Sequence, residues 1–380
     1  MPKQREREIP SLSAALEQVP DTRQSQGKRH PLPAMLRLAC VALLCGRQTI
    51  LGISEWVSDY GKPYLKRFGF TYPKPPGQAT WYRVLGGIDW AELEAQTYRW
   101  AQQVLQVLAD NSTLQGIAID GKTLRGSKKQ GAEDAHLLAA VGHQLAVTLM
   151  PIAVADKTNE IPTVIDLLSH LVVEGHVFTM DALLTQREIA ETLLARQGDY
   201  VFVVKDNQPH LREDIELLFT APPPQVRGAI WPTARTRACD HGRIEIREVQ
   251  ATTALNDYLD WPGVQQVFRL VRHRTNKKAG TATTETTYGI TSLSPTQASA
   301  EQLLTLVRQH WTIENQVHWV RDVVFGEDLA QTRRGHLPHI VATLRNTVIS
   351  LLRANGIQCI AQARRRFAAR PKEALTLVGI

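Results

Sequence analysis

Two apolar runs that each end in an aspartate constrain the fold of this chain most. Gly116–Ile119 leads into Asp120, and Val177–Met180 leads into Asp181. Short apolar runs bounded by turn residues are typical of buried strands. Residues at the carboxyl ends of strands in an α/β sheet lie at its usual functional edge. The sequence therefore predicts two strands that end at these aspartates, with both carboxylates converging at one edge of an α/β sheet.

Two convergent carboxylates make an oxygen-rich site that suits Mg²⁺ or Mn²⁺. A strand-ending aspartate is also a common helix cap or turn residue, so the pair alone leaves a structural role open. A third acid, Glu314, lies in a helix predicted over 299–324. Steps of three and four residues predict one helix face made of Val307, Trp311, Glu314, His318 and Arg321.

Glu314 is open to three interpretations. An acid on an apolar and aromatic helix face is costly to bury without a partner or a metal. The first interpretation is a metal ligand that joins Asp120 and Asp181. The second is an ordinary ion pair with His310, His318 or Arg321. The third is a transition-metal site made of His310, Glu314 and His318, which is less favoured because one straight helix rarely points three such residues at one ion.

The pattern of the chain changes three times. Residues 1–110 have helical periodicity and are predicted to form a helical N-terminal domain, and their excess of basic residues favours DNA binding by it. Residues 111–220 alternate strand and helix signals, which indicates an α/β domain with a mixed sheet. Residues 221–295 begin with prolines and continue with period-two stretches, typical of a β-rich insertion. Residues 296–380 return to helical periodicity and end in a basic tail, completing the core.

Charge is unevenly distributed along the chain. The formal net charge is +7; residues 329–380 contribute +8, residues 1–110 contribute +4, and the centre is acidic. Basic flanks around an acidic centre fit a metal-binding catalytic centre between regions that bind a polyanion. Many basic proteins bind nothing charged, so composition alone only favours nucleic acid. No uninterrupted apolar span or signal peptide is visible, which predicts a cytoplasmic protein with no membrane partner.

At its acidic residues the chain resembles the DDE transposases of bacterial insertion sequences, which have a ribonuclease-H-like core. It is most similar to the group containing the Rhs-element-associated H-repeat proteins. The resemblance runs in order over nearly the whole chain. It is carried by Pro20–Arg23, Gly27–Pro31, Ala118–Ser127, Lys157–Ile161, Thr179–Leu183, Lys205–Gln208 and His310–Trp319.

The resemblance implies that Asp120, Asp181 and Glu314 are the catalytic triad and bind Mg²⁺, with Mn²⁺ as a substitute. It also implies that 221–295 is the β-strand insertion found between the second aspartate and the glutamate. Related groups carry a Tyr, an Arg and a Lys at seven before, four before and seven after the glutamate. These positions are Val307, His310 and Arg321 here, so only the last keeps its charge. A hairpin-forming cleavage route is therefore not implied.

The expected activity is cleavage at the element's terminal inverted repeats and joining of the 3′ ends to target DNA by two-metal-ion phosphoryl transfer. The expected partners are double-stranded DNA, at transposon ends and target, and a second copy of the chain, giving a dimer on DNA near the nucleoid. Trp311 and Trp319 either stack on an unpaired base or pack in the core. Two rival functions stay open: a catalytically silent DNA-binding protein, and a metal-dependent nuclease without strand transfer. The expected DNA contacts are Lys122, Arg125, Lys205, Arg321, Arg333 and Arg334.

Overall fold

The computed structural model of the chain divides into two compact units. The first unit comprises residues 1–111, 121–157 and 313–380, and the second comprises 112–120 and 158–312. Strand β1 (Gln115–Leu124) begins in the second unit and ends in the first. The structure describes residues 8–24, 28–108, 114–124, 135–143, 146–154, 160–240, 242–278, 280–311, 313–329 and 335–380.

The first unit is organised around α2 (Leu32–Leu44). Nearly all of this helix is buried, because its alanine- and leucine-rich sequence is apolar on every side. It ends where Gly46 adopts a positive φ of 94°, which a residue without a side chain does at little cost. The helix packs against helices from both ends of the chain. The other N-terminal helices are α1 (Leu12–Glu17), α3 (Ile50–Trp56), α4 (Leu65–Phe68), α5 (Gln78–Gly86) and α6 (Trp90–Leu108), with short η2 (Val57–Gly61) and η3 (Lys62–Tyr64).

A second buried helix of the first unit, α11 (Leu337–Ala354), packs on α2, α6 and strand β3 (Val147–Val154). β3 pairs antiparallel with β2 (Ala135–Gly142). The Ser350 hydroxyl accepts a hydrogen bond of 3.0 Å from the Thr148 backbone N–H and so ties helix to strand. Helices α12 (Ile360–Ala369) and α13 (Pro371–Val378) complete this unit and pack against α2.

The second unit is built on a mixed sheet. Its strand order is β1–β4–β5–β9–β8–β7–β6. β1, β4 and β5 run parallel, and β5, β9, β8, β7 and β6 pair antiparallel. The predicted mixed α/β fold is therefore confirmed. The strands after β1 are β4 (His176–Met180), β5 (Asp199–Val204), β6 (Thr233–Asp240), β7 (Arg243–Thr252), β8 (Gln266–Asn276) and β9 (Thr281–Thr291).

Helix α10 (Ala300–His310) covers one face of this sheet. A capping box starts it, in which the Ser299 hydroxyl and the Gln302 amide bond each other's backbone N–H groups. Its leucines share one core cluster with Val177 of β4 and Val249 of β7. Alternation along β4 buries Phe178 on the opposite face. The unit's other helices are α7 (Glu160–His170), α8 (Arg187–Ala195) and α9 (Pro209–Thr220).

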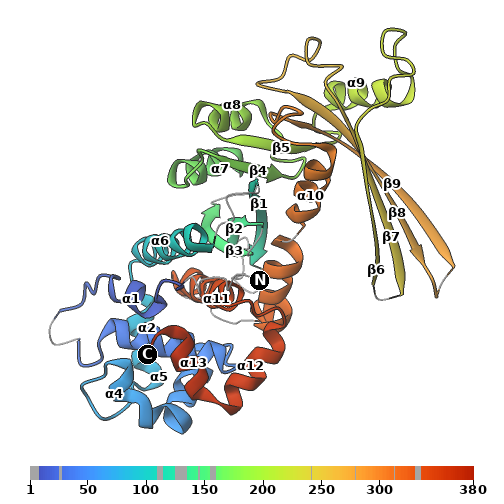
Figure 1. The fold of residues 1–380 in the computed structure, drawn as a ribbon. Coiled ribbons are helices and arrows are strands. Elements are labelled where there is room, and N and C mark those ends of the chain that lie inside the picture. Colours follow the sequence, from blue (N-terminus) through green and yellow to red (C-terminus); the bar gives the residue numbers. More distant parts are fainter. Residues whose placement is uncertain are drawn as a thin grey trace, which may run out of the picture. The chain divides into compact units, whose positions relative to one another are not determined.

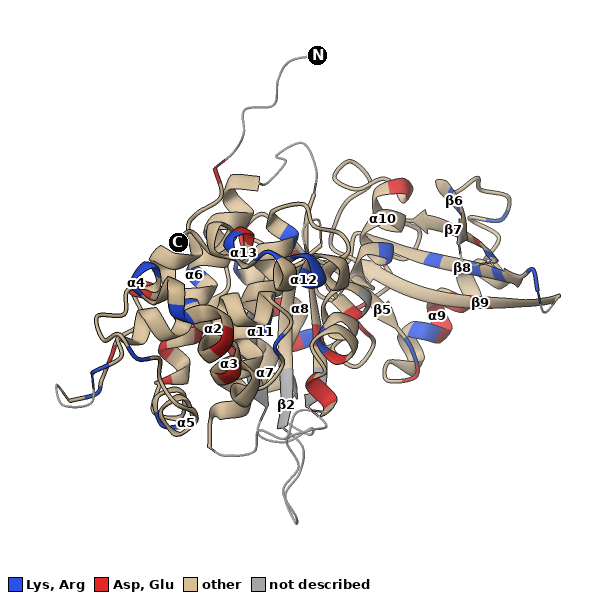
Figure 2. Ribbon diagram, turned by 90° about the horizontal axis from the view of Figure 1, so that it is seen from below, with Lys and Arg blue, Asp and Glu red and all other residues tan. Residues whose placement is uncertain are grey.

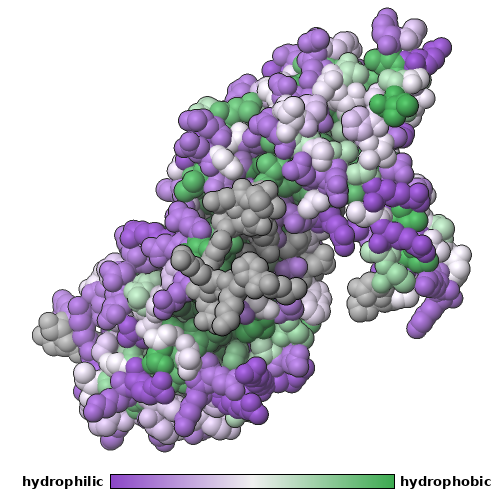
Figure 3. Space-filling model, in the orientation of Figure 1, coloured by the Kyte–Doolittle hydropathy of each residue, from purple (hydrophilic) through white to green (hydrophobic). Residues whose placement is uncertain are grey.

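Strands β6–β9 extend as a long curved ribbon within the second unit (Figure 1). They lie inside the stretch where a β-rich insertion is predicted. Lys and Arg are prominent along β8 of this ribbon and along α12 of the first unit (Figure 2). On the visible face, hydrophilic residues dominate and apolar patches are small (Figure 3).

The structure corrects three expectations from the sequence. β1 does not end at Asp120 but continues to Leu124, although its parallel pairing with β4 does stop just before the aspartates. The helix predicted over 299–324 is an α-helix to His310 and winds as π-helix afterwards. The basic C-terminal residues form two packed helices rather than a tail. Within the described residues, no helix combines the length and apolar character needed to cross a membrane.

Candidate active site

Asp120 lies within β1, and Asp181 directly follows the neighbouring parallel strand β4. Ile119 of β1 pairs in register with Met180 of β4, so each aspartate is the next residue after this last pair. Adjacent strands lie roughly 4.8 Å apart, which brings both side chains to one edge of the sheet. Asp120 is partly exposed and Asp181 is exposed. The register thus places the two aspartates at accessible, neighbouring positions. That their carboxylates form one site stays a prediction.

The loop after β4, residues 181–186, is held by side-chain hydrogen bonds to its own backbone. The Leu184 N–H donates to Oδ1 of Asp181 at 3.3 Å, so this aspartate also serves as a turn residue. Thr185 is fully buried, and its hydroxyl donates to the Val203 carbonyl of β5 at 2.7 Å. A carboxylate has about four acceptor sites, and the turn role uses one of them.

The stretch Lys205–Gln208 clamps this loop from the neighbouring strand end. The Asn207 amide donates to the carbonyls of Ala182 and Thr185, and the Gln208 amide donates to the Thr185 carbonyl at 3.1 Å. The sequence analysis used this stretch for the family resemblance and Lys205 as a DNA contact, but it did not predict the clamp. Their position directly after a buried strand was the available signal. Lys205 itself is exposed beside the clamp.

His310 links the last turn of α10 to β4. The residue that it contacts there, Thr179, lies two residues before Asp181. Its Nδ1 lies 3.0 Å from the Thr179 hydroxyl, and the imidazole is buried. Burial lowers the pKa of His310, while the negative charge of Asp181 opposes that shift. The imidazole is therefore neutral at pH 7. Because its Nδ1 is engaged by the Thr179 hydroxyl, that nitrogen serves to connect α10 with the strand, which weighs against the histidine-rich metal site considered from the sequence.

Glu314 lies in the first unit, on the π-helical segment η6 (Ile313–His318) that continues into η7 (Val320–Val324). Its carboxylate Oε2 is 3.4 Å from Nδ1 of His318. The Glu314 side chain is 59% exposed, whereas that of His318 is buried. The carboxylate is therefore accessible, and its contact with His318 agrees with the ion-pair interpretation while leaving the metal-ligand interpretation open.

The π winding also separates residues that the sequence placed on one helix face. π-helix has wider spacing than the 3.6-residue period and is frequent at functional sites. Trp311 and Trp319 are 55% and 53% exposed, whereas Arg321 is fully buried. The structure therefore contradicts core packing for either tryptophan. Both rings present apolar surface to solvent.

Arg321 is held in a buried ion cluster. Its guanidinium lies 2.6 Å from Oε2 of Glu327, in the short helix η8 (Glu327–Leu329). Arg345 of α11 reaches the other oxygen, Oε1, at 3.1 Å and donates to the Gln48 carbonyl at 2.8 Å. Buried charges are tolerated when they are paired in this way. In this structure Arg321 is a buried structural residue paired with Glu327, which weighs against its expected contact with a DNA phosphate.

Arg364 of α12 fixes the end of the same segment. Its guanidinium lies over the Phe325 ring at 4.1 Å and donates to the carbonyls of Leu43 and Arg47. Burial is the main cause that lowers its pKa to about 10, so it remains charged at pH 7. The neighbouring Arg365 and Arg366 are exposed. The described basic residues of the C-terminal part thus divide into structural and accessible ones.

Four expected DNA contacts cannot be located. Arg125, Arg333 and Arg334, and the side chain of Lys122, lie outside the described residues.

Comparison with known proteins gives a consistent result. A family model described as "Transposase DDE domain" matches residues 111–351, and a model described as DDE_Tnp_1-associated matches residues 13–101. The chain is 30% identical over 361 residues to "Putative transposase YncI" of Escherichia coli O157:H7, covering 91% of this chain and 88% of that protein. It is 29% identical over 360 residues to "H repeat-associated putative transposase YhhI" of Escherichia coli K12, covering 91% of each.

A solved structure, the cryo-EM structure of the piggyBac transposase synaptic complex with hairpin DNA, aligns with 97% of this chain and 77% of its own. The TM-score is 0.45 and the sequence identity is 8%.

Proposed function

The chain belongs to the DDE transposase family, and we propose that it binds the terminal inverted repeats of its own element, cleaves the end phosphodiesters and joins the 3′ ends to target DNA. The proposed triad is Asp120, Asp181 and Glu314. The observation that most supports the proposal is the register of β1 and β4, whose last pair, Ile119 and Met180, directly precedes the two aspartates.

The available side chains fit divalent metal ions. Accessible carboxylate oxygens are the ligands that Mg²⁺ and Mn²⁺ prefer. Asp120, Glu314 and His318 are a set of residue types that can hold a metal ion, and His318 would add a nitrogen donor absent from the predicted triad. When bound, two ions lower the pKa of an attacking water and stabilise the leaving 3′ oxygen.

The chain's own residues would orient the acids and the DNA. The clamp of Asn207 and Gln208 would fix the loop that carries Asp181. Lys205 is exposed beside this loop and would contact a phosphate. Trp311 and Trp319 would stack on unpaired bases near the cut, because both rings are exposed.

The proposal extends to the rest of the chain. Residues 1–110 would recognise the ends, 111–220 and 296–380 would form the catalytic core, and 221–295 would be its insertion. Lys122, Arg125, Arg333 and Arg334 would add phosphate contacts. Synapsis of two ends needs at least two copies, so the acting form would be a dimer on DNA, in the cytoplasm at the nucleoid.

The test uses a duplex that carries the element's terminal repeat, incubated with the full chain in Mg²⁺. We expect end cleavage, and joining of pre-cleaved 3′ ends to a plasmid target. Binding without cleavage would instead indicate a silent DNA-binding protein. Cleavage without joining would indicate a nuclease.

A further inference from the structure

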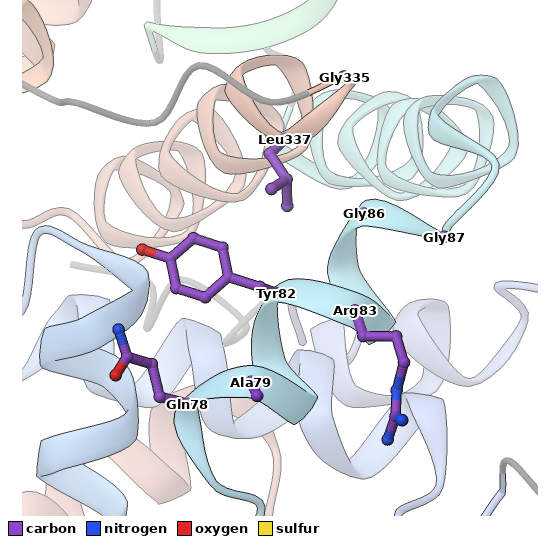
Figure 4. A pocket seen from close by; sticks show the side chains of 8 residues that line it. All are labelled: Gln78, Ala79, Tyr82, Arg83, Gly86, Gly87, Gly335 and Leu337. Atoms are coloured by element: carbon purple, nitrogen blue, oxygen red, sulfur yellow. The ribbon is translucent and has the colours of Figure 1, made fainter.

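An open pocket lies in the first unit between α5 and the start of α11. Its volume is about 690 Å³, within the range of pockets that hold small ligands. Tyr82 and Arg83 of α5 line it, together with Gln78 one turn earlier and Leu337 of α11 (Figure 4). None of the residues that line this pocket belongs to the proposed triad.

The sequence of α5 explains how the helix is anchored and which side of it stays open. Trp81, Val84 and Leu85 are buried and anchor the helix. Gln78, Tyr82 and Gly86 follow at steps of four, so they form a stripe on another side of the helix. Gly86 leaves space on this stripe. A Cβ at its position would fill that space and lie in van der Waals contact with Leu337, 3.7 Å from its Cγ.

The lining combines three kinds of group. The Tyr82 ring lies between the Gln78 amide and Leu337, and Arg83 extends to the other side (Figure 4). An aromatic wall stacks on a base, an amide bonds a base edge, and a guanidinium binds a phosphate. The pocket also borders the start of α11, at Gly335 and Leu337.

We propose that this pocket binds one unpaired nucleotide of DNA, with its base on Tyr82 and its phosphate toward Arg83. The inference rests on the proposed DNA binding but not on the metal chemistry. A free nucleotide has the same chemistry, so the test separates the two sources.

The experiment measures binding of full-length Asp181→Asn in EDTA, so that cleavage does not contribute. The probes are a blunt terminal-repeat duplex and the same duplex with a three-nucleotide overhang containing 2-aminopurine. We expect the overhang to tighten binding by roughly 5- to 150-fold, as stacking of one base does, and to quench the probe's fluorescence. Equal affinity for the two duplexes would overturn the proposal.

Variants assign the effect to the pocket. Tyr82→Ala should abolish the preference for the overhang but keep blunt-end binding, whereas Tyr82→Phe should retain it. Arg83→Gln should weaken overhang binding. The matched controls are Tyr60→Ala, at an exposed tyrosine, and Arg99→Gln, at an exposed arginine. The proposal would be wrong if Tyr82→Ala kept the wild-type preference for the overhang duplex, or if the control variants lost that preference equally.

Two further measurements keep the test decisive if Tyr82→Ala does not fold. A 4-thiothymidine overhang should crosslink to the 78–87 peptide when Tyr82 and Arg83 are unchanged, and crosslinking elsewhere contradicts the proposal. Free dTMP should compete only at much higher concentration than the overhang. If dTMP binds as tightly as the overhang, the ligand is a free nucleotide and the proposal for DNA is wrong. Cleavage of blunt ends, measured separately with Asp181 intact, reports on the proposed function alone.

Discussion

The two parts of the proposed triad are held by different kinds of interaction. Asp120 and Asp181 are positioned by strand register and by neutral side-chain bonds to backbone carbonyls. The segment that carries Glu314 winds as π-helix, and buried arginines hold its far end. Neutral bonds cost little to bury, whereas buried charges hold a geometry only while every partner is present. We therefore expect that removal of one interaction partner destabilises the segment that carries Glu314 more than the region of Asp120 and Asp181.

The largest expected effect is on the stability of the Glu314 segment. Glu327→Gln would leave Arg321 and Arg345 buried without their shared counter-charge, and breaking a buried pair in this way costs about 3–5 kcal/mol. Urea denaturation of the full chain measures the loss. Glu373→Gln is the control, since Glu373 pairs with two arginines on the surface and should change little. Equal stability of Glu327→Gln and wild type would contradict the comparison.

A smaller effect is expected at the clamp of the Asp181 loop. Thr185→Val keeps the shape but removes the donor to the Val203 carbonyl, at a cost of about 1–3 kcal/mol. Cleavage should fall by roughly 10- to 100-fold, as it does when groups that orient a metal ligand are lost. Thr305→Val is the control, at an exposed threonine of α10 whose hydroxyl donates to the Glu301 carbonyl of its own helix. Unchanged cleavage in Thr185→Val would mean that the loop needs no such bond.

The free energy of unfolding of the first unit should also depend on pH, because Glu94 is buried there. Burial raises the pKa of Glu94 from 4.5 to about 8, although its bond to Thr343 opposes the shift. The folded chain then keeps a proton that the unfolded chain releases above pH 4.5. This stability is complete below pH 4.5 and is lost as pH rises to about 8, by up to ~1.4 kcal/mol per pH unit.

The measurement for Glu94 is the urea midpoint of wild type and Glu94→Gln between pH 5 and 8.5. The variant should show a flatter decline with pH, because its side chain does not titrate. Parallel pH profiles would show that Glu94 keeps an ordinary pKa.

The smallest expected effect concerns Lys205. Lys205→Gln should weaken binding to all DNA sequences alike and reduce the log–log salt slope by about 0.9, the value for one phosphate contact. Lys372→Gln, at an exposed lysine of α13, is the control. A salt slope in Lys205→Gln equal to that of the wild type would show that this lysine contacts no phosphate.

The sequence predicted the strands that lead to the two aspartates, though not the end of β1, because their signals are local. Apolar runs that end in an acid specify buried strands, and the parallel strands place Asp120 beside Asp181. The other region depends on contacts between distant residues. Arg345 meets Glu327 from eighteen residues away, and α-helical periodicity cannot show where the winding becomes π. The burial of Arg321 was therefore missed.

The central claim is that Asp120, Asp181 and Glu314 bind metal together, and Mg²⁺-dependent thermal melts test it most directly. Ligand linkage should stabilise the wild-type chain by about 2.7 kcal/mol at a hundredfold excess of Mg²⁺ over its Kd. Glu314→Gln should be no less stable without metal, because like carboxylates no longer repel, and its gain from Mg²⁺ should shrink. A Glu314→Gln chain that is destabilised without metal yet keeps the full Mg²⁺ gain would show that Glu314 only pairs with His318 and would contradict the claim.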